Sequence, residues 1–192
     1  MRRIGLFGGS FDPVHTGHLL VARTALEGLA LDRLFFLPAA QSPFKPGQSL
    51  TSGALRARLL RLALAGWTQC EVDTGELERG GVSYTIDTVR AFTRRFPGAA
   101  LFWLIGGDHL PLLPQWREAH ALAELVEFAV VPRPGVAVGP GPGAPFRIRV
   151  LAGSLSTIAA SDIRARVRAG QSLAGLVPAP VAEVIRNSGL YL

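Results

Sequence analysis

Two histidines that follow a glycine-rich run near the N-terminus have the residue types and the spacing to bind phosphate. The run contains Gly8 and Gly9, and His15 and His18 follow on either side of Gly17. Glycine lets the backbone approach a ligand closely, and a helix that starts after a parallel strand directs free amide groups at an anion. Imidazole nitrogens can donate hydrogen bonds to phosphate oxygens. Residues 8–18 therefore indicate a cradle for the phosphates of a nucleoside triphosphate.

Each part of this stretch also has a simpler explanation when it is taken alone. A Gly-Gly pair after a strand is commonly just a tight turn. His15 and His18 have the i, i+3 spacing of a metal-binding pair, but the other histidines, His109 and His120, offer no obvious completing cluster. The spacing differs from both the dinucleotide-binding fingerprint and the P-loop lysine motif. The whole stretch is far more specific than any of its parts.

A parallel sheet must position this loop, because strand-like and helix-like patterns alternate along the chain. We predict a Rossmann-like, doubly wound α/β fold that forms a single domain over residues 1–192. The predicted strands are residues 3–7, 34–38, 71–74, 101–105, 128–131 and 146–151. The predicted helices are residues 19–29, 54–65, 84–96, 118–125, 161–169 and 180–187. The Pro- and Gly-rich residues 132–145 are predicted to be a surface loop.

The predicted strand order indicates where a ligand would lie. In an open parallel sheet, ligands bind beyond the carboxyl ends of the strands, where the strand order reverses. With the order 3-2-1-4-5, three segments would meet there: the loop after the first strand, the loop that contains Gly106 and Asp108, and the helix that starts at Ser161. We therefore predict one site that is assembled from distant parts of the chain.

The composition favours a protein of the cytoplasm. Hydrophobic residues make up 48% of the chain, enough for a substantial core, yet no apolar run approaches the ~20 residues of a membrane helix. The N-terminus lacks the ~7–15 apolar residues of a secretory signal, and the single cysteine, Cys70, allows no disulfide within the chain. The net charge of +6 suits a phosphate-bearing partner, whereas the basic residues are too scattered for a nucleic-acid surface. We expect no membrane or nucleic-acid partner; a monomer and a homo-oligomer both fit.

The pattern Gly-x-Phe-Asp-Pro-x-His-x-Gly-His at residues 9–18 resembles the signature of the HxGH nucleotidyltransferases. That superfamily is related in fold to the class I aminoacyl-tRNA synthetases. The resemblance implies that His15 and His18 contact triphosphate oxygens and stabilise the charge that develops at the α-phosphate. It also extends to Ser10.

Residues 158–164, Ile-Ala-Ala-Ser-Asp-Ile-Arg, are similar to a second motif of that superfamily, Ile-Ser-Ser-Thr-x-Ile-Arg. Ser161 is predicted to be a helix N-cap, and Arg164 lies one turn later, where its guanidinium suits the β- and γ-phosphates. Taken alone, the segment is better explained as a capped surface helix with a solvated arginine, but the first motif reverses that preference. Ala159 and Ala160 replace two serines of the family, so we expect some hydroxyl contacts to phosphate to be missing.

The chain is also similar to the bacterial nicotinate-nucleotide adenylyltransferases over almost its whole length. The matching segments are, in order, Ser83-Tyr84-Thr85, Ile105-Gly106-Gly107-Asp108, Trp116, Arg133-Pro134-Gly135 and Gly189-Leu190-Tyr191. The resemblance implies that nicotinate mononucleotide reacts with ATP and that pyrophosphate is released. Lys45 matches the Pro-His-Lys segment of that family, whereas Phe44 stands where the family has histidine.

The resemblance and the chemistry of the residues together assign the expected site. Catalytic roles are expected for His15, His18, Lys45 and Arg164. Contacts with ATP are expected from Gly8, Gly9, Ser10, Phe11, His15, His18, Gly106, Asp108, Arg133, Ser161 and Arg164. Contacts with nicotinate mononucleotide are expected from Ser10, Lys45, Tyr84, Thr85, Asp108 and Trp116. Mg²⁺ is expected to bridge the ATP phosphates mostly without dedicated protein carboxylates.

Binding of the pyridine ring is expected to involve a helix start and an aromatic ring. Free amides at the start of the helix predicted over residues 84–96, together with the Thr85 hydroxyl, can bind the pyridine carboxylate. Trp116 can stack on the pyridinium ring, although core packing is the better explanation when this tryptophan is taken alone.

Two other functions stay open on the sequence. A sibling adenylyltransferase that uses phosphopantetheine or nicotinamide mononucleotide would share the histidine loop, but the Ser83-Tyr84-Thr85 segment and Trp116 favour nicotinate. A non-catalytic nucleotide- or RNA-binding module would fit the net charge of +6. A steep salt dependence of RNA affinity, with no pyrophosphate released from ATP, would indicate such a module.

Overall fold

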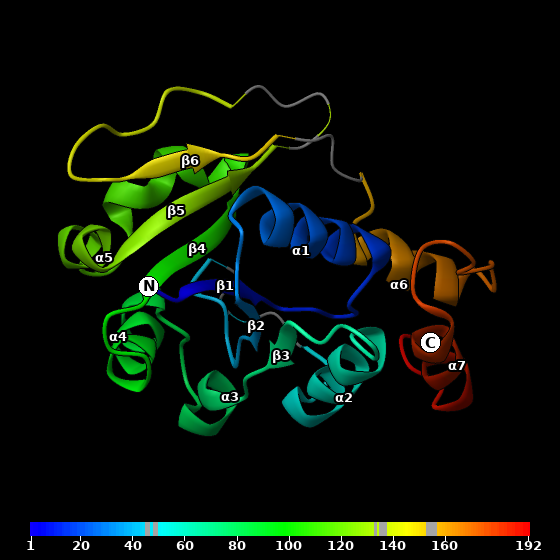
Figure 1. Cartoon of the computed structure of the whole chain (residues 1–192). Helices are drawn as coiled ribbons and strands as arrows, with labels where there is room; N and C mark the ends of the chain where they lie inside the picture. The colour runs from blue at the N-terminus through cyan, green and yellow to red at the C-terminus, as the bar shows by residue number, and fades with distance from the viewer. Residues whose placement is uncertain (45–46, 48–49, 133, 135–137, 153–156) are drawn as a thin grey trace.

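A parallel sheet forms the centre of the computed structural model, which describes residues 1–44, 47, 50–132, 134, 138–152 and 157–192. In these residues, six strands form one sheet with the order β3-β2-β1-β4-β5-β6 (Figure 1). The strands are β1 (Arg3–Gly9), β2 (Arg33–Pro38), β3 (Cys70–Val72), β4 (Ala100–Gly106), β5 (Val126–Val131) and β6 (Ile148–Val150). The predicted order 3-2-1-4-5 is confirmed, and β6 pairs with the outer side of β5.

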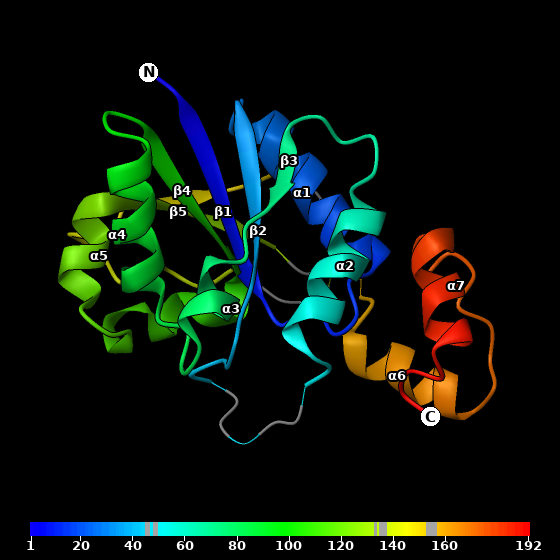
Figure 2. The ribbon, with the colours of Figure 1, turned by 90° about the horizontal axis from the view of Figure 1, so that it is seen from below.

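Helices cover both faces of this sheet, as a doubly wound fold requires (Figures 1 and 2). The helices are α1 (Thr16–Gly28), α2 (Gly53–Ala63), α3 (Gly75–Arg79), α4 (Thr85–Arg95), the 3₁₀ helix η1 (Gly107–Gln115), α5 (Ala119–Leu125), α6 (Ala160–Arg168) and α7 (Ala179–Asn187). Consecutive residues of β2 pack on opposite faces: Phe36 joins the cluster formed with α1 and α2, and Phe35 joins the cluster formed with α4 and α5. The predicted Rossmann-like α/β fold is therefore confirmed.

The apolar run predicted to be a central strand lies at the centre of the sheet. β4 is hydrogen-bonded to β1 on one side and to β5 on the other, and its five residues from Leu101 to Ile105 are all buried. A strand that is covered by helices on both faces has no solvent-exposed side, which explains why its sequence shows no polar alternation. The carboxyl end of β4 is thereby fixed next to the carboxyl end of β1.

Two short helices were not predicted from the sequence. α3 has five residues, too few for a helical period to be visible. η1 contains Pro111 and Pro114, which disfavour an α-helix, and the chain forms a 3₁₀ helix there instead. The described part of residues 132–145 contains no helix or strand, as predicted. Within the residues that the structure describes, no helix combines the length and apolarity that a membrane span requires.

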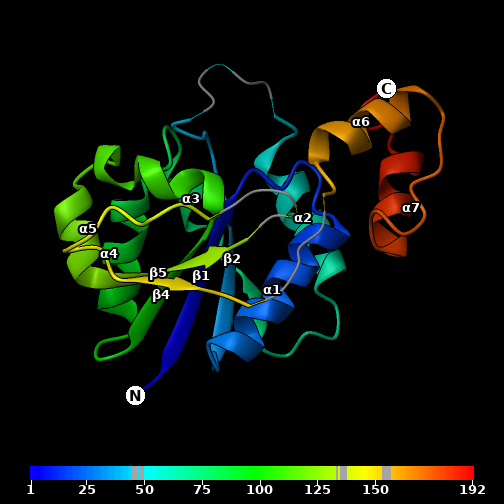
Figure 3. The ribbon, with the colours of Figure 1, turned by 90° about the horizontal axis from the view of Figure 1, so that it is seen from above.

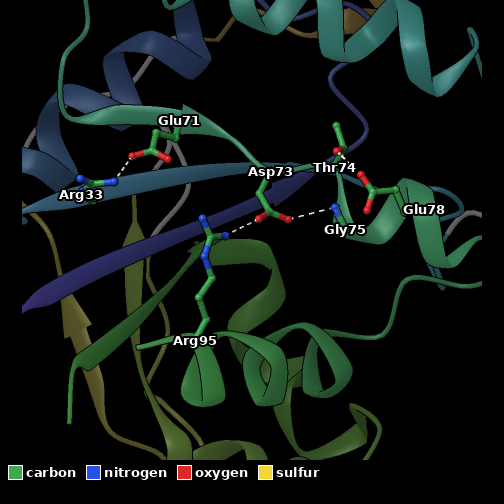
Figure 4. Close-up of polar contacts among 7 residues, drawn as sticks. All are labelled: Arg33, Glu71, Asp73, Thr74, Gly75, Glu78 and Arg95. Atoms are coloured by element: carbon green, nitrogen blue, oxygen red, sulfur yellow. Dashed lines mark hydrogen bonds and ion pairs between the residues drawn. The ribbon is translucent and has the colours of Figure 1, made fainter. Parts of the chain in front are cut away.

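Polar contacts fix the turn from β3 into α3 (Figure 4). Asp73, which follows β3, accepts a hydrogen bond from the backbone N–H of Gly75 at 2.9 Å and one from Nη1 of Arg95 at 2.8 Å. Arg33 of β2 forms an ion pair with Glu71 of β3. Exposed ion pairs of this kind contribute at most about 1 kcal/mol each, so their main role is geometric. Asp73 links the last turn of α4 to the start of α3.

The C-terminal helices α6 and α7 lie beside α1 and α2, away from the sheet (Figure 3). Ile163 of α6 and Ile185 of α7 are buried in the same hydrophobic cluster as α1 and α2. At the start of α1, the backbone N–H of Thr16 donates to the carbonyl of Leu176 at 2.9 Å, and the Thr16 hydroxyl donates to the same carbonyl at 3.0 Å. The C-terminal segment is thus joined directly to the start of α1.

The single cysteine packs as expected of a structural thiol. Cys70 begins β3, is half-buried and forms no disulfide. Burial raises the pKa of the Cys70 thiol to about 11. A thiol of this kind is a poor nucleophile near neutral pH, which agrees with the packing role predicted from the sequence.

Candidate active site

A cavity of about 670 Å³ opens at the carboxyl edge of the sheet. Its walls come from the ends of β1 and β4 and from the starts of α1, α4 and α6. The sequence-predicted site residues that line it are Gly8, Gly9, Ser10, Phe11, His15, His18, Thr85, Gly106, Trp116, Ser161 and Arg164. The three segments predicted to meet at this edge therefore do meet there.

Four predicted site residues are not in this set. Tyr84 is the N-cap of α4, and the Arg117 guanidinium lies 4.5 Å from the centre of its ring. The Asp108 side chain is 50% exposed, and its Oδ2 lies 3.9 Å from Nε2 of His109. Neither Tyr84 nor Asp108 is among the described residues that line the cavity. Lys45 and Arg133 lie outside the described residues.

The two glycines at the end of β1 are required by packing as well as by access to a ligand. A Cβ atom on Gly8 would lie 2.9 Å from the Trp103 ring of β4, and one on Gly9 would lie 3.0 Å from the Phe11 ring. Phe11 is buried at 2% exposure and has a φ of 48°, which turns its ring into the core. A contact between Phe11 and a nucleotide would therefore use its backbone.

The two histidines of the loop form one unit at the start of α1. His15 is the N-cap of α1, and its backbone N–H donates to Nδ1 of His18 at 3.2 Å. The two imidazole rings stack with their centres 3.7 Å apart, and the edge of His18 meets Phe11. A ring nitrogen that accepts a hydrogen bond carries no proton, so the proton of neutral His18 resides on Nε2.

The described residues supply no further side chain that would complete a metal site with His15 and His18. Across residues 1–44, 50–132 and the other described positions, no group of three or more His, Cys, Asp or Glu side chains could hold a metal ion. The site is better suited to bind an anion, because it combines a helix N-terminus, imidazole donors and a guanidinium.

The N-cap of α6 lies two residues before the position predicted from the sequence. The N-cap is Ala159, so the prediction that Ser161 caps this helix is wrong. Ala159 is extended, and its carbonyl accepts from the backbone N–H of Asp162 and Ile163, which starts the helix before Ser161. Ser161 instead lies in the first turn, where backbone N–H groups have no partner within a helix. It faces the cavity with Arg164.

Arg164 is anchored to the histidine loop. Its Nη1 donates to the backbone carbonyl of Asp12 at 2.7 Å. One such contact uses one of the five N–H donors of a guanidinium, so the group can hold its position and still bind a phosphate oxygen. The two sequence motifs, which were predicted to meet at one site, are therefore joined by a direct hydrogen bond.

A buried arginine that was not predicted from the sequence holds the histidine loop in place. Arg56 of α2 is 2% exposed and donates to the carbonyls of Ser10 at 2.7 Å, Ala39 at 2.8 Å and Thr51 at 2.8 Å. Burial lowers the pKa of Arg56, and the nearby Asp12 carboxylate acts in the opposite direction. Arg56 thereby joins the histidine loop to both ends of the segment between β2 and α2.

The sequence contained a signal for this role. The buried positions of α2 include Arg56, Leu59, Leu60 and Ala63, which follow the i, i+3, i+4, i+7 spacing of a helix face that packs on a core. An arginine at a core position of an amphipathic helix must satisfy its charge with buried partners.

Aromatic side chains form another part of the cavity lining. Trp116 follows η1 and packs edge-to-face on Phe128 of the core, with ring centres 6.1 Å apart. Phe44 lies 5.6 Å from the Trp116 ring and 5.3 Å from the His109 ring. Trp116 therefore packs against the core and also lines the cavity, so the two explanations of this residue are compatible.

A buried carboxyl group lies in the same wall as Thr85 and was also not predicted. Glu76 is 4% exposed, lines the cavity and accepts a hydrogen bond from the Thr88 hydroxyl at 2.7 Å. Burial raises the pKa of Glu76, although the hydroxyls of Thr88 and Ser83 favour its ionised form. Since Thr88 is on α4 and Ser83 precedes it, Glu76 holds the start of α4 in place.

We predict that replacing Arg56 destabilises the protein strongly. The Arg56→Met variant keeps most of the side-chain volume but leaves three carbonyls in buried or partly buried surroundings without their donors, so the free energy of unfolding should fall by about 3–5 kcal/mol. Urea unfolding measures this change. Arg58→Met, on the exposed side of α2, is the control and should change stability by less than about 0.5 kcal/mol. Equal effects of the two substitutions would contradict the role of Arg56.

The fold and the cavity together define a class of protein. A phosphate-binding loop at a helix N-terminus, at the point where the strand order of a doubly wound sheet reverses, is typical of nucleotide-binding α/β proteins. Comparison with known proteins narrows this class.

The cytidylyltransferase-like family model matches residues 6–166. A protein of Gemmatimonas aurantiaca named "Probable nicotinate-nucleotide adenylyltransferase" is 46% identical over 98% of this chain and 92% of its own. A protein of the same name from Opitutus terrae is 43% identical over 98% of this chain and 97% of its own. The chain therefore belongs to the cytidylyltransferase-like family and, within it, to the nicotinate-nucleotide adenylyltransferases.

A solved structure supports the fold. The Plasmodium falciparum nicotinic acid mononucleotide adenylyltransferase, in a complex with NaAD, superposes with a TM-score of 0.79. The two proteins are 15% identical, and the match covers 100% of this chain and 98% of that one. The order of strands and helices is thus preserved at a sequence identity that is too low to compare individual site residues.

Proposed function

We propose that this protein transfers the adenylyl group of ATP to nicotinate mononucleotide, which yields the dinucleotide nicotinate adenine dinucleotide and pyrophosphate. The observation that carries the proposal is the cavity itself. The phosphate-binding loop with His15 and His18 lines one part of it, and Thr85 and Trp116 line another. The space of about 670 Å³ is within the ~300–1,000 Å³ usual for small-molecule sites.

The triphosphate of ATP would lie over the start of α1. His18 would donate from Nε2 to the α-phosphate, because its Nδ1 already accepts from the backbone. His15 and the first turn of α6 would bind the β- and γ-phosphates with Arg164, whose position Asp12 fixes. On the resemblance alone, Lys45 remains a proposed phosphate contact and Arg133 a proposed ATP contact. These groups would neutralise the charge that moves onto pyrophosphate as it leaves.

The reaction needs no general base. A phosphate oxygen of nicotinate mononucleotide, already anionic near neutral pH, attacks the α-phosphorus of ATP. A new P–O bond forms as the bond from the α-phosphorus to the bridging oxygen of pyrophosphate breaks, and that oxygen keeps the electron pair. The site therefore contributes in-line positioning and charge stabilisation.

Mg²⁺ would enter as part of the Mg·ATP substrate. The described residues offer no group of three metal-binding side chains, so phosphate oxygens and water are the expected ligands of the ion. Both substrates are soluble nucleotides, and we expect the protein to act in the cytoplasm.

The pyridine ring would bind at the aromatic end of the cavity. Trp116 offers a ring face to the pyridinium cation. α4 begins at Thr85, so the amides of its first turn and the Thr85 hydroxyl are available in the cavity wall for the carboxylate of nicotinate. An uncharged amide would gain less from the same helix start, which favours the acid over nicotinamide mononucleotide.

We predict that His18→Ala lowers turnover by on the order of 10²–10³, since it removes one donor that stabilises the charge of the transition state. Pyrophosphate release from Mg·ATP and nicotinate mononucleotide measures the effect. His120→Ala is the matched control, because His120 is exposed and does not line the cavity. Near-normal turnover in a folded His18→Ala variant would overturn the role of His18.

The substrate itself is tested by offering the acid and the amide mononucleotide in separate assays. We predict pyrophosphate release with nicotinate mononucleotide and a kcat/KM that is larger than that for nicotinamide mononucleotide by on the order of 10² or more, because the site is built to bind the carboxylate. Mass spectrometry of the dinucleotide product is the second readout. A preference for the amide would contradict the substrate, and no pyrophosphate with either compound would contradict the activity.

A further inference from the structure

The loop that carries the histidines is held by residues from the far end of the chain. Asp12 lies in the middle of this loop and is 4% exposed. Its Oδ1 accepts a hydrogen bond from the Tyr191 hydroxyl at 2.6 Å, and its Oδ2 accepts one from the backbone N–H of Thr51 at 3.1 Å. A buried carboxylate depends on such donors, because it has lost its water.

The backbone at Tyr191 is shaped for this contact. Tyr191 has a φ of 71°, a left-handed conformation that is unfavourable for a non-glycine residue. A residue keeps such a conformation where its contacts compensate for the cost. The preceding Gly189, with a φ of 60°, ends α7 and returns the chain toward the loop. The last residues of the chain are therefore folded onto Asp12.

The Tyr191 hydroxyl is suited to be a permanent donor. Burial raises the pKa of Tyr191, and its hydrogen bond to Asp12 raises it further, so the phenol stays protonated across the working pH range of a cytoplasmic protein. On the other side of Asp12, its backbone carbonyl accepts from Arg164 at 2.7 Å. The same residue thus links the C-terminal tail to one of the proposed phosphate-binding groups.

We propose that Tyr191 is a positioning residue for adenylyl transfer: by holding Asp12, its hydroxyl fixes the loop that presents His15 and His18 to the triphosphate. The inference rests on the proposed function. Tyr191 does not line the cavity, so its effect reaches the substrate through Asp12. The residues proposed for the pyridine end, Thr85 and Trp116, are held by α4 and the core instead.

The Tyr191→Phe variant removes the hydroxyl and keeps the ring. We expect kcat to fall about tenfold, as for the loss of one hydrogen bond to a charged group, while KM for nicotinate mononucleotide stays within about twofold. The melting temperature shows whether the fold is kept. A role in stability alone would lower the melting temperature and leave kcat of the folded enzyme unchanged, which would overturn the inference.

Two shortened chains provide an independent test. Removal of Leu192, which is 84% exposed, should leave kcat unchanged, whereas removal of Tyr191 and Leu192 together should reproduce the loss seen in Tyr191→Phe. Equal kcat values for the two shortened chains would overturn the inference. The full-length enzyme is assayed beside them: if it releases no pyrophosphate, the proposed function fails, whereas an active enzyme that is insensitive to Tyr191 contradicts the positioning role alone.

Discussion

A buried carboxylate, that of Asp12, is the interaction on which the site depends. Once removed from water, this group requires donors, and they come from Thr51 and from Tyr191, which is 179 residues away in sequence. Arg56, also buried, donates to the backbone carbonyl of Ser10 in the same loop. The two buried charges fix the histidine loop relative to α2 and the C-terminal tail. The proposed phosphate donors at the start of α1 are therefore held in place by the fold itself.

The sheet adds a second constraint, which is the close approach of β1 and β4. Gly8 lies against the Trp103 ring, so the end of β1 has no room for a side chain. The loops that follow these two strands both line the cavity, together with Trp116. One cavity thus brings the proposed phosphate donors and the proposed pyridine site together, as an in-line attack on one phosphorus requires.

Much of the fold follows from local patterns in the sequence. The strands and the histidine loop could be predicted because hydrophobic periodicity and glycine spacing are visible in short windows. The strand order followed from the doubly wound fold class, since periodicity alone does not determine topology. The partners of Asp12 and Arg56 could not be predicted, since their contacts join residues that are distant along the chain. The N-cap of α6 was misplaced because Ser161 is the better capping residue, while the backbone of Ala159 begins the helix. The short helices α3 and η1 left no periodic signal.

Nitrogen-15 NMR of the histidine rings during titration with Mg·ATP tests the phosphate cradle most directly. The chain has four histidines, so each ring can be assigned by substitution. We expect neutral His18 to carry its proton on Nε2 in the free protein, and Mg·ATP to shift the signals of His15 and His18 but not that of the exposed His120. Signals of both loop histidines that stay unchanged in saturating Mg·ATP would contradict the proposed role of this loop in binding phosphate.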